Sequence, residues 1–449
     1  MSRDWQRYRL GDLVSKVGSG STPRGGSAAY QSSGTPLIRS MNVVFFGFKY
    51  DGLAYIDDQQ AAALDNARVA VNDVLLNITG ASIGRVTLVP SSLHDARVNQ
   101  HVCIIRPAAA LDARFLNAFL SSPEMQGQIW ADNYGVTRQA LTKQQVLDFE
   151  VPVPPLDEQR RIADKLDTMI ACVDACRDRL ARVAPLLKRF RRSVLAAAMS
   201  GRLITDIEPT FNSRLESLAS LGDVAGGLTK NARRDQLALR RPYLRVANVQ
   251  ANELRLHDVS VIGLTEGEFA KTKLREGDLL IVEGNGSIEQ IGRVAMWSGE
   301  IADCCHQNHL IRWRAGARLL PKFALGFLLS PEGRRQIEAV ASSTTGLHTL
   351  SVSKVGQLQV PVPTLQLQSE IVRRVETLFA FADRLEARLA QAQTAADRLT
   401  PSLLAKAFRG ELVPQDPADE PAAELLKRLA ASRTAEAPKT RRGRQGQPA

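Results

Sequence analysis

The tetrapeptide Val151-Pro152-Val153-Pro154 decides how this chain is organised, because it recurs as Val360-Pro361-Val362-Pro363 after 209 residues. The same offset aligns the residues downstream of each tetrapeptide, up to a run over residues 193–203 that repeats over residues 402–412. Upstream the match continues with small gaps, and Ile83-Gly84-Arg85-Val86 corresponds to Ile291-Gly292-Arg293-Val294. Two copies of about 200 residues are too long for solenoid repeats, so each copy is a domain with an appendage.

The first part of each copy predicts a mixed globule. Short β-rich runs lie at Asp73–Thr79 and Val102–Arg106, and the cluster Gly18–Pro23 is rich in turn residues. A helical stretch is expected over Ala113–Ile129. The pattern favours an α+β (mixed α/β) globule.

The second part of each copy predicts a long helix. Apolar residues recur in alternating steps of four and three, which is the heptad pattern of a coiled coil. About 40 residues in such a helix make a rod of roughly 60 Å. The positions assigned to the seam include Ile162, Leu166, Met169, Val173, Cys176, Leu180, Val183 and Leu187 in the first copy, and Ile371, Val375, Leu378, Leu385 and Leu389 in the second.

The order globule, rod, globule, rod predicts two similar globules separated by two long helices that pair as an antiparallel coiled coil with approximate two-fold symmetry. We expect domains at residues 1–150, 151–205, 206–359 and 360–412, and a flexible tail over 413–449. The proline clusters suit the approach to each rod, whereas Pro185 and Pro401 fall inside the seams and should kink or break them.

The composition indicates a globular protein with a polyanionic partner. The 449 residues carry a net charge of +11, and residues 413–449 supply only two of those charges. Five cysteines in so long a chain favour a reducing compartment. The sequence has neither an apolar run long enough for a membrane span nor an apolar N-terminal stretch typical of a signal peptide. We therefore expect a cytoplasmic protein.

Two related basic globules on a stiff spacer suit a duplex whose half-sites lie about one helical turn apart. The chain also resembles the specificity subunits of type I restriction–modification systems over nearly its whole length. The motifs that carry the resemblance are Pro152-Val-Pro154-Pro-Leu-Asp-Glu158-Gln159-Arg-Arg-Ile162, Ala407-Phe408-Arg-Gly410-Glu-Leu412, and the opening Trp5…Leu10-Gly11-Asp12…Gly20-Ser-Thr22-Pro23.

The resemblance implies a non-catalytic chain that recognises a bipartite, asymmetric site in double-stranded DNA, one half per globule. It further implies that the coiled coil sets the spacer and docks two methylation subunits and two restriction subunits. Those partners are expected to use S-adenosylmethionine, ATP and Mg²⁺, and this chain is expected to use no cofactor of its own.

Catalytic motifs do not fit the sequence. It has no Asn/Asp-Pro-Pro-Tyr/Phe loop for amino methylation and no Gly-x₄-Gly-Lys-Ser/Thr loop for ATP. The acids of Asp278-Leu-Leu-Ile-Val-Glu283-Gly-Asn285 lack the lysine of a nuclease site, and a strand ending in a turn is the better interpretation. Cys304-Cys305-His306…His309 fits no common zinc spacing, so we expect no metal.

Candidate DNA contacts are polar residues in corresponding loops of the two globules, because paired donors and acceptors read base edges. Residues that match between the copies could instead hold the fold or contact phosphate, which carries no sequence information. The candidates are Arg39, Asn42, Thr79, Ser82, Arg85, Asn99, Gln100, His101, Thr137 and Arg138 in the first copy, and Arg245, Asn248, Asn285, Ser287, Arg293, Gln307, Asn308, His309, Thr344, Thr345 and His348 in the second.

Two alternatives remain open at the level of sequence. A coiled-coil scaffold with protein-binding globules would not need the positive charge of the folded body and would not show salt-dependent DNA binding. A stand-alone DNA-modifying enzyme would methylate or cleave DNA without partner subunits.

Overall fold

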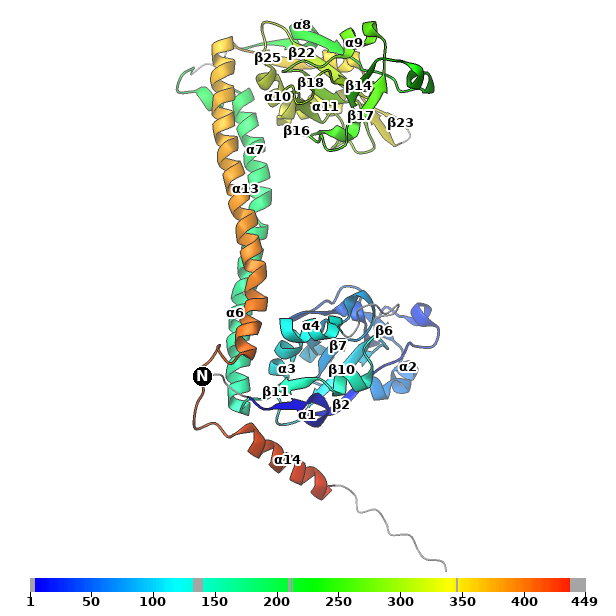
Figure 1. The fold of residues 1–449 in the computed structure, drawn as a ribbon, viewed down its shortest axis with the longest axis vertical. Coiled ribbons are helices and arrows are strands. Elements are labelled where there is room, and N and C mark those ends of the chain that lie inside the picture. The colour runs from blue at the N-terminus through cyan, green and yellow to red at the C-terminus, as the bar shows by residue number, and fades with distance from the viewer. Residues whose placement is uncertain (1–4, 132–139, 209–210, 212, 345, 437–449) are drawn as a thin grey trace, which may run out of the picture. The chain divides into compact units, whose positions relative to one another are not determined.

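The computed structural model describes residues 5–131, 140–208, 211, 213–344 and 346–436. It contains two compact units that do not follow chain order: Met1–Arg179 with Ala392–Ala449, and Leu180–Gln391. Each unit therefore combines one globule with segments from both long helices, and the expected helical domains are not separate bodies (Figure 1).

The first globule is built on a four-stranded antiparallel sheet with a smaller sheet beside it. The large sheet has the order β2 (Val14–Ser19), β10 (Val102–Pro107), β7 (Val74–Asn77), β8 (Val86–Leu88), and the smaller has the order β6 (Ala54–Ile56), β3 (Thr35–Ile38), β9 (Arg97–Val98). Two-stranded pairs are β1 (Arg7–Arg9) with β11 (Glu150–Pro152) and β4 (Val43–Val44) with β5 (Gly47–Phe48). The helices are α1 (Leu10–Leu13), α2 (Asp58–Ala63), α3 (Ala113–Leu120), α4 (Pro123–Ala131) and α5 (Lys143–Leu147).

The second globule repeats this topology. Its large sheet has the order β13 (Gly222–Ala225), β22 (Leu310–Ala315), β18 (Leu279–Val282), β20 (Val294–Met296), and its smaller sheet has the order β17 (Ser260–Gly263), β14 (Arg240–Leu244), β21 (Cys305–His306). The remaining strands are β12 (Arg214–Ser217) with β25 (Gln359–Val362), β15 (Val249–Gln250) with β16 (Glu253–Leu254), and β19 (Gly284–Asn285), β24 (Leu347–Thr349), β23 (Ser342–Thr344). The helices are α8 (Leu218–Leu221), α9 (Glu266–Thr272), α10 (Pro321–Leu329), α11 (Pro331–Val340) and α12 (Val352–Gly356). The α+β class predicted from the sequence is confirmed.

The central strands are buried on both faces, which explains their unbroken apolar sequences. In β18, Leu279 and Ile281 pack into one core cluster while Leu280 packs into another, because successive side chains point to opposite faces. β7 divides in the same way, with Val74 and Leu76 on one side and Leu75 on the other. Each large sheet therefore separates two cores.

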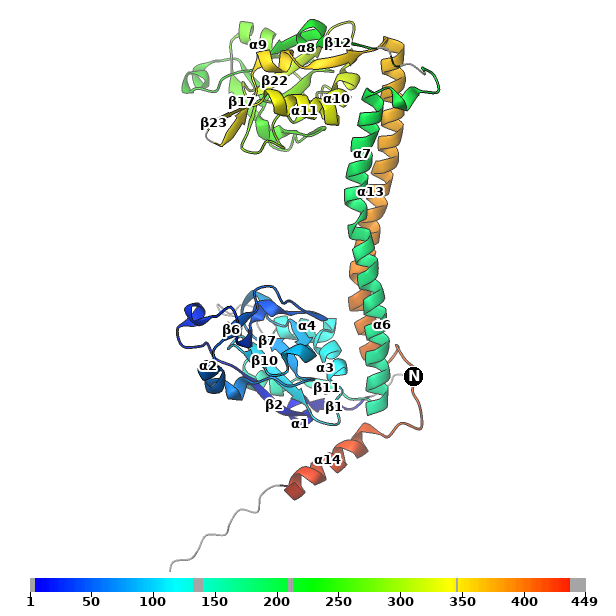
Figure 2. The same cartoon turned by 180° about the vertical axis from the view of Figure 1, so that it is seen from behind.

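The long helices are α6 (Leu156–Ala181), α7 (Val183–Met199) and α13 (Leu365–Phe408). Inside the first unit, Arg161 bonds Asp419 while Arg177 bonds the carbonyl of Ala396, so the two chain segments run antiparallel. Inside the second unit, α7 and the first part of α13 lie side by side (Figures 1 and 2), and Arg191 of α7 pairs with Asp383 and Glu386 of α13.

The heptad seam is buried in two different ways. Ile162 and Leu166 belong to the core of the first globule, and Ile371 belongs to the core of the second. Further along, Leu187 and Leu389 pack between the helices, with Leu180, Val183 and Leu385 partly buried against them. The start of each rod therefore packs into the core of its own globule together with the end of the other rod, through Leu404 and Ala407 in the first unit and Ala198 in the second.

The prediction for Cys176 was wrong, because this seam position is exposed. The adjacent Arg177 reaches α13 instead, donating to the Ala396 carbonyl at 3.3 Å and pairing with Asp397 at 3.4 Å. Cys176 itself stays exposed beside these polar contacts.

The two internal prolines behave differently. The first rod is interrupted at Arg182, and α7 begins at Val183, so Pro185 falls in a first helical turn, where its missing N–H has no helical partner to lose. Pro401 lies inside α13, which continues to Phe408, so of the expected kink or break the structure excludes the break.

The segment expected to be a flexible tail is partly folded. It contains α14 (Ala422–Glu436), and Val413, Ala422 and Leu426 pack against the core of the first globule. The carboxylate of Asp419 bonds the Arg161 guanidinium, which holds the pKa of Asp419 below its usual range. Within the described residues, no helix combines the length and the apolar character that a membrane span requires.

Candidate nucleic-acid interface

The candidate site of the first globule lies where β7 ends. The N–H of Ile78 donates to the carbonyl of His101 at 3.0 Å, and the carbonyl of Ile78 accepts from the N–H of Leu141 at 2.8 Å. Thr79 also forms an isolated β-bridge with Ala140. Three segments far apart in sequence therefore meet at one strand end, and several of the sequence candidates lie on them.

Side chains at this strand end form a network around His101. The Nε2 atom of Gln100 lies 2.9 Å from the Nε2 atom of His101, and the Nδ1 atom of His101 lies 2.5 Å from the Thr79 hydroxyl. Asn99 is buried and accepts the N–H of His101. Ser82 is half-buried and Arg85 is exposed on the turn that follows the strand. The structure thus brings together five of the first copy's candidates, from Thr79 to His101, and leaves Arg85 at the edge of the group.

The second globule repeats the arrangement with different side chains. The N–H of Glu283 donates to the carbonyl of His309 at 3.0 Å, and the carbonyl of Glu283 accepts from the N–H of Leu350 at 2.7 Å. Asn285 in β19 faces His348 in β24. The Nδ1 atom of His309 lies 2.9 Å from the Glu283 carboxylate.

The other candidates of the second site lie on the turns next to Glu283 and His309. Asn285 accepts the N–H of Ser287, which caps the turn after the strand. Arg293 donates to Gln250 at 3.2 Å, and burial followed by the charge of Arg255 lowers the Arg293 pKa. Gln307 and Asn308 are half-buried on the turn that leads to His309. Of these residues, Asn308 lies beside the Glu283–His309 pair, with its Nδ2 atom 3.5 Å from the Nε2 atom of His309.

The matched pairs Arg39 with Asn42 and Arg245 with Asn248 serve the fold. Asn42 is fully buried, accepts the N–H of Arg39 and donates to the carbonyl of Lys49. Asn248 accepts the N–H of Arg245 and donates to the carbonyls of Arg255 and Asp258. Both amides are used by main-chain groups, so they have no free edge for a base.

The two arginines fix the same loops. Arg39 bonds the carbonyl of Gly52 and lies over the Tyr30 ring, and Arg245 pairs with Asp258 at 2.7 Å. Thr137, Arg138 and Thr345 lie outside the described residues, and of Thr344 the structure describes only its place in β23.

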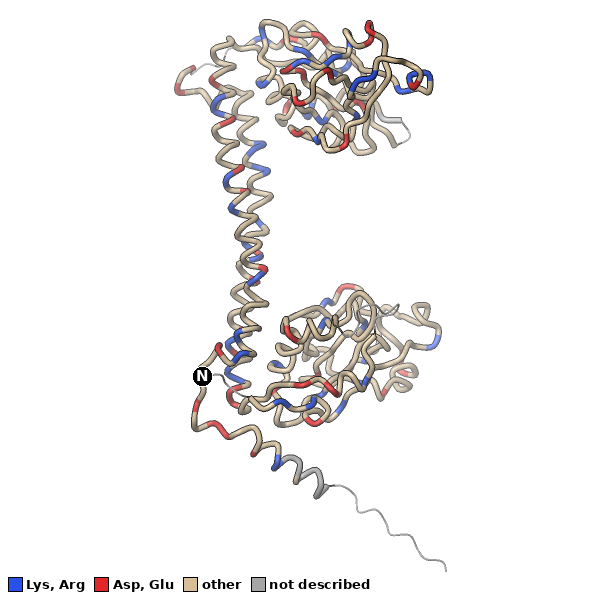
Figure 3. Tube along the Cα trace, viewed as in Figure 1, with Lys and Arg blue, Asp and Glu red and all other residues tan. Residues whose placement is uncertain are grey.

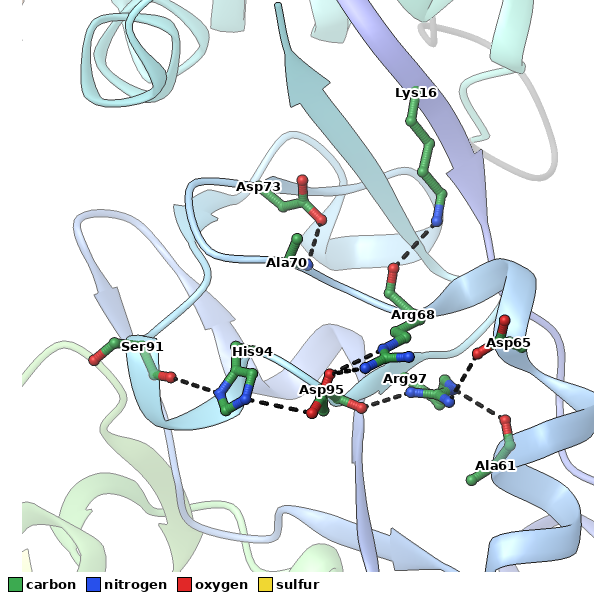
Figure 4. Close-up of polar contacts among 10 residues, drawn as sticks. All are labelled: Lys16, Ala61, Asp65, Arg68, Ala70, Asp73, Ser91, His94, Asp95 and Arg97. Atoms are coloured by element: carbon green, nitrogen blue, oxygen red, sulfur yellow. Dashed lines mark hydrogen bonds and ion pairs between the residues drawn. The ribbon is translucent and has the colours of Figure 1, made fainter.

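Arginine and aspartate side chains form a charged cluster elsewhere in the first globule. Figure 4 shows Arg68 bonded to Asp95, with Arg97 bonded to Asp65 and to the main-chain carbonyls of Ala61 and Asp95. The hydrogen bond from Arg68 lowers the pKa of Asp95. Each guanidinium drawn there already has an acidic partner, so the cluster offers little positive charge to a polyanion.

The acids that resembled a nuclease run have other roles. Asp278 is fully buried, accepts two hydrogen bonds from Arg314 and caps the N–H of Arg275. Asp73 and Arg106 form the matching pair in the first globule. The strand-and-turn interpretation is confirmed, since β18 lies between Asp278 and Glu283.

The Cys304-Cys305-His306 run is a buried part of the core. Burial raises the pKa of Cys304 to about 12 and lowers that of His306 to about 4, and the His306 ring contacts the carbonyl of Thr272. Over the residues that the structure describes, no group of three or more His, Cys, Asp or Glu side chains is placed to hold a metal ion.

Basic residues are not confined to one region. Figure 3 shows Lys and Arg on both globules and along the helices. The charge excess, the duplicated polar strand ends and the helical appendages together define a class of protein that recognises nucleic acid with two related domains.

Comparison with known proteins places the chain within that class. The family model described as the type I restriction modification DNA specificity domain matches twice, over residues 2–184 and 214–393, and the chain belongs to this family of specificity subunits. It is 30% identical over 423 residues to the EcoKI specificity subunit of Escherichia coli strain K12, covering 89% of each chain. It is 30% identical over 418 residues to the StySPI specificity subunit of Salmonella potsdam, covering 89% of this chain and 88% of the relative.

Solved structures share the fold. One chain of a type I R-M system superimposes with a TM-score of 0.64 at 19% identity, covering 92% of this chain and 99% of that one. The HsdS subunit of Thermoanaerobacter tengcongensis gives a TM-score of 0.58 at 18% identity, covering 91% and 97%. The protein is a DNA-recognition subunit, and the relatives that it matches are named specificity subunits and not catalytic ones.

Proposed function

We propose that this chain selects a bipartite, asymmetric sequence in double-stranded DNA and that each globule reads one half. The observation that carries the proposal is the strand end built twice on the same main-chain hydrogen bonds but with different side chains, Thr79 with His101 in one copy and Glu283 with His309 in the other. Because the main chain is the same at the two strand ends, the side chains that contact bases are presented in the same way in both globules. Because those side chains differ, the two globules recognise different bases.

The paired helices have a second role in this proposal. They set the number of unread base pairs between the half-sites and provide the docking surface for two methylation and two restriction subunits. Those partners supply the chemistry with S-adenosylmethionine, ATP and Mg²⁺, and the complex acts on DNA in the cytoplasm.

The direct test is methylome sequencing of the source strain with and without this gene. Loss of one two-part adenine-methylated motif, with all other motifs unchanged, is the expected result. An unchanged methylome in a strain whose methylation subunit is expressed would contradict the proposal. A loss that involves a continuous motif would contradict the assignment of one half-site to each globule.

DNA binding by the purified complex separates this function from a protein scaffold. Binding to a duplex that carries the motif should weaken steeply as salt rises, because each phosphate contact releases counterions. A scaffold with protein-binding globules would show no preference for that duplex over a scrambled one.

A further inference from the structure

Glu283 occupies a distinctive place in the second site. It follows β18 directly, and its main chain joins the His309 turn to the segment at Leu350. Its side chain is 32% exposed and that of His309 is 57% exposed. A carboxylate therefore reaches the surface at the point where three polar loops meet.

The Glu283 carboxylate has acceptor capacity to spare. His309 donates to Oε2 at 2.9 Å, and in the described part of the chain Oε1 receives no hydrogen bond. A carboxylate accepts about four hydrogen bonds, and one bond from a neighbouring donor fixes its plane while leaving the other oxygen free. His309 thus positions Glu283 and does not neutralise its accepting edge.

Charge decides what such a group can contact on DNA. The basic and amide candidates of both sites can bond phosphate as well as bases, so their position alone cannot assign them. A carboxylate is repelled by phosphate and gains a hydrogen bond only from an amino group on a base edge. Cytosine presents its N4 amino group as a lone donor, whereas the N6 amino group of adenine stands beside the N7 acceptor, which would oppose the second carboxylate oxygen.

The first globule has no equivalent acid. Ile78 makes the same two main-chain hydrogen bonds that Glu283 makes, to His101 and Leu141, but its side chain packs against the core. The histidine is retained in both sites, and its partner changes from the Thr79 hydroxyl to a carboxylate. The two sites therefore share their main-chain hydrogen bonds and differ in the side chain that bonds the histidine.

We propose that Glu283 reads a base in the second half-site by accepting a hydrogen bond from the N4 amino group of a cytosine in the major groove, and that His309 is its positioning residue. This inference rests on the proposed function, because it needs the second globule to contact DNA. Beyond the proposed function, it names the residue that contacts the base, the base edge that it contacts and the half-site that contains the base.

The experiment uses the full chain co-expressed with its cognate methylation subunit. Methylation is measured on a duplex library in which every position of the second half-site is randomised in turn. Wild-type protein should require a C·G pair, in one orientation, at one position of that half-site. Glu283→Gln and Glu283→Ala should lower the preference for that pair by roughly 5- to 150-fold, the range for one good base contact, and leave the first half-site unchanged.

Three further variants sharpen the result. Glu289→Gln removes an exposed acid from the same loop, and its motif should equal that of the wild type. His309→Gln keeps a donor beside Glu283 and should retain most of the preference, whereas His309→Ala should lose part of it at the same position. A stability role alone would not move the preference at one base pair.

The outcomes are distinct. A wild-type complex that methylates no two-part motif would contradict the proposed function itself. A wild-type motif that survives unchanged in both Glu283 variants would overturn only the present inference, as would relaxation in the first half-site or at an adenine. Complete loss of methylation on every sequence, by variants that still form the complex and melt like the wild type, would also overturn it, because one base contact leaves the other contacts in place.

Discussion

Replacing Gln368 by leucine should destabilise the second unit because this glutamine joins the long helix to the globule. Its Oε1 accepts the N–H of Leu320 at 2.8 Å, and its Nε2 donates to the carbonyls of Arg318 and Pro363 at 2.9 Å each. The side chain is completely buried. Leucine has nearly the same size but offers none of these bonds.

The magnitude follows from the three main-chain groups left without a partner. Each lost hydrogen bond to a buried group costs about 1–2 kcal/mol, and the greater apolarity of leucine returns about 1 kcal/mol. The expected loss in the free energy of unfolding is therefore about 3 kcal/mol. With a urea dependence of about 3 kcal/mol per molar for a unit of this size, the midpoint should fall by about 1 M.

Urea titration followed by tryptophan fluorescence measures this change. Trp297 and Trp313 are both buried in the second globule and report on its unfolding. Gln366→Leu is the matched control, since Gln366 is exposed two residues earlier on the same helix, and its midpoint should stay within about 0.2 M of the wild type. Equal midpoints for the two variants would refute the view that Gln368 holds the joint.

Three other predictions concern separate parts of the molecule. Acidification to pH 5 should cost the second unit about 2 kcal/mol through His306, whose folded pKa of about 4 lies below its usual value near 6.5, so stability is lost as the pH falls between the two. Urea midpoints at pH 7 and pH 5 test this, and a His306→Gln variant with an undiminished pH dependence would disprove it. Arg161→Gln should free the segment around Asp419 and speed tryptic cleavage at Arg428 by about tenfold, whereas Arg160→Gln, which breaks a surface pair with Asp157, should not. Cleavage at equal rates in both variants would count against the Arg161 contact. Exchanging residues 1–150 for the corresponding globule of a relative should change only the first half of the methylated motif, and a change in both halves would show that the globules do not read independently.

The heptads and the internal repeat made the fold predictable because both depend on residue spacing within one copy. Leu187 and Leu389 recur at the positions expected of a helix seam and are buried there. The sequence could not show that Ile162 and Ile371 pack into globules, since a seam position has the same spacing whichever surface covers it. The same spacing predicted burial of Cys176, which is exposed.

The site was less predictable because its contacts join residues distant in the chain. Asn42 and Asn248 had the chemistry of base readers, and only the closure of their loops onto Lys49 and Arg255 reveals their structural role. The sequence around Glu283 resembles only a run of acids in a nuclease site, and its partner His309 lies 26 residues further on. Only the register between β18 and β22 brings that pair together.

The joint between globule and helix has an implication for how such chains diversify. Gln159 bonds the N–H of Asp112 and the carbonyls of Ala110 and Pro154, the same three kinds of main-chain group that Gln368 bonds in the second copy. Neither glutamine uses a side chain of its globule. Because both globules present the same kinds of amide and carbonyl to their glutamine, this contact places no demand on the residues that read DNA. A globule of the same topology that reads another sequence can therefore keep this contact with the helix, so genetic exchange can combine a new reader with an existing helix at this point.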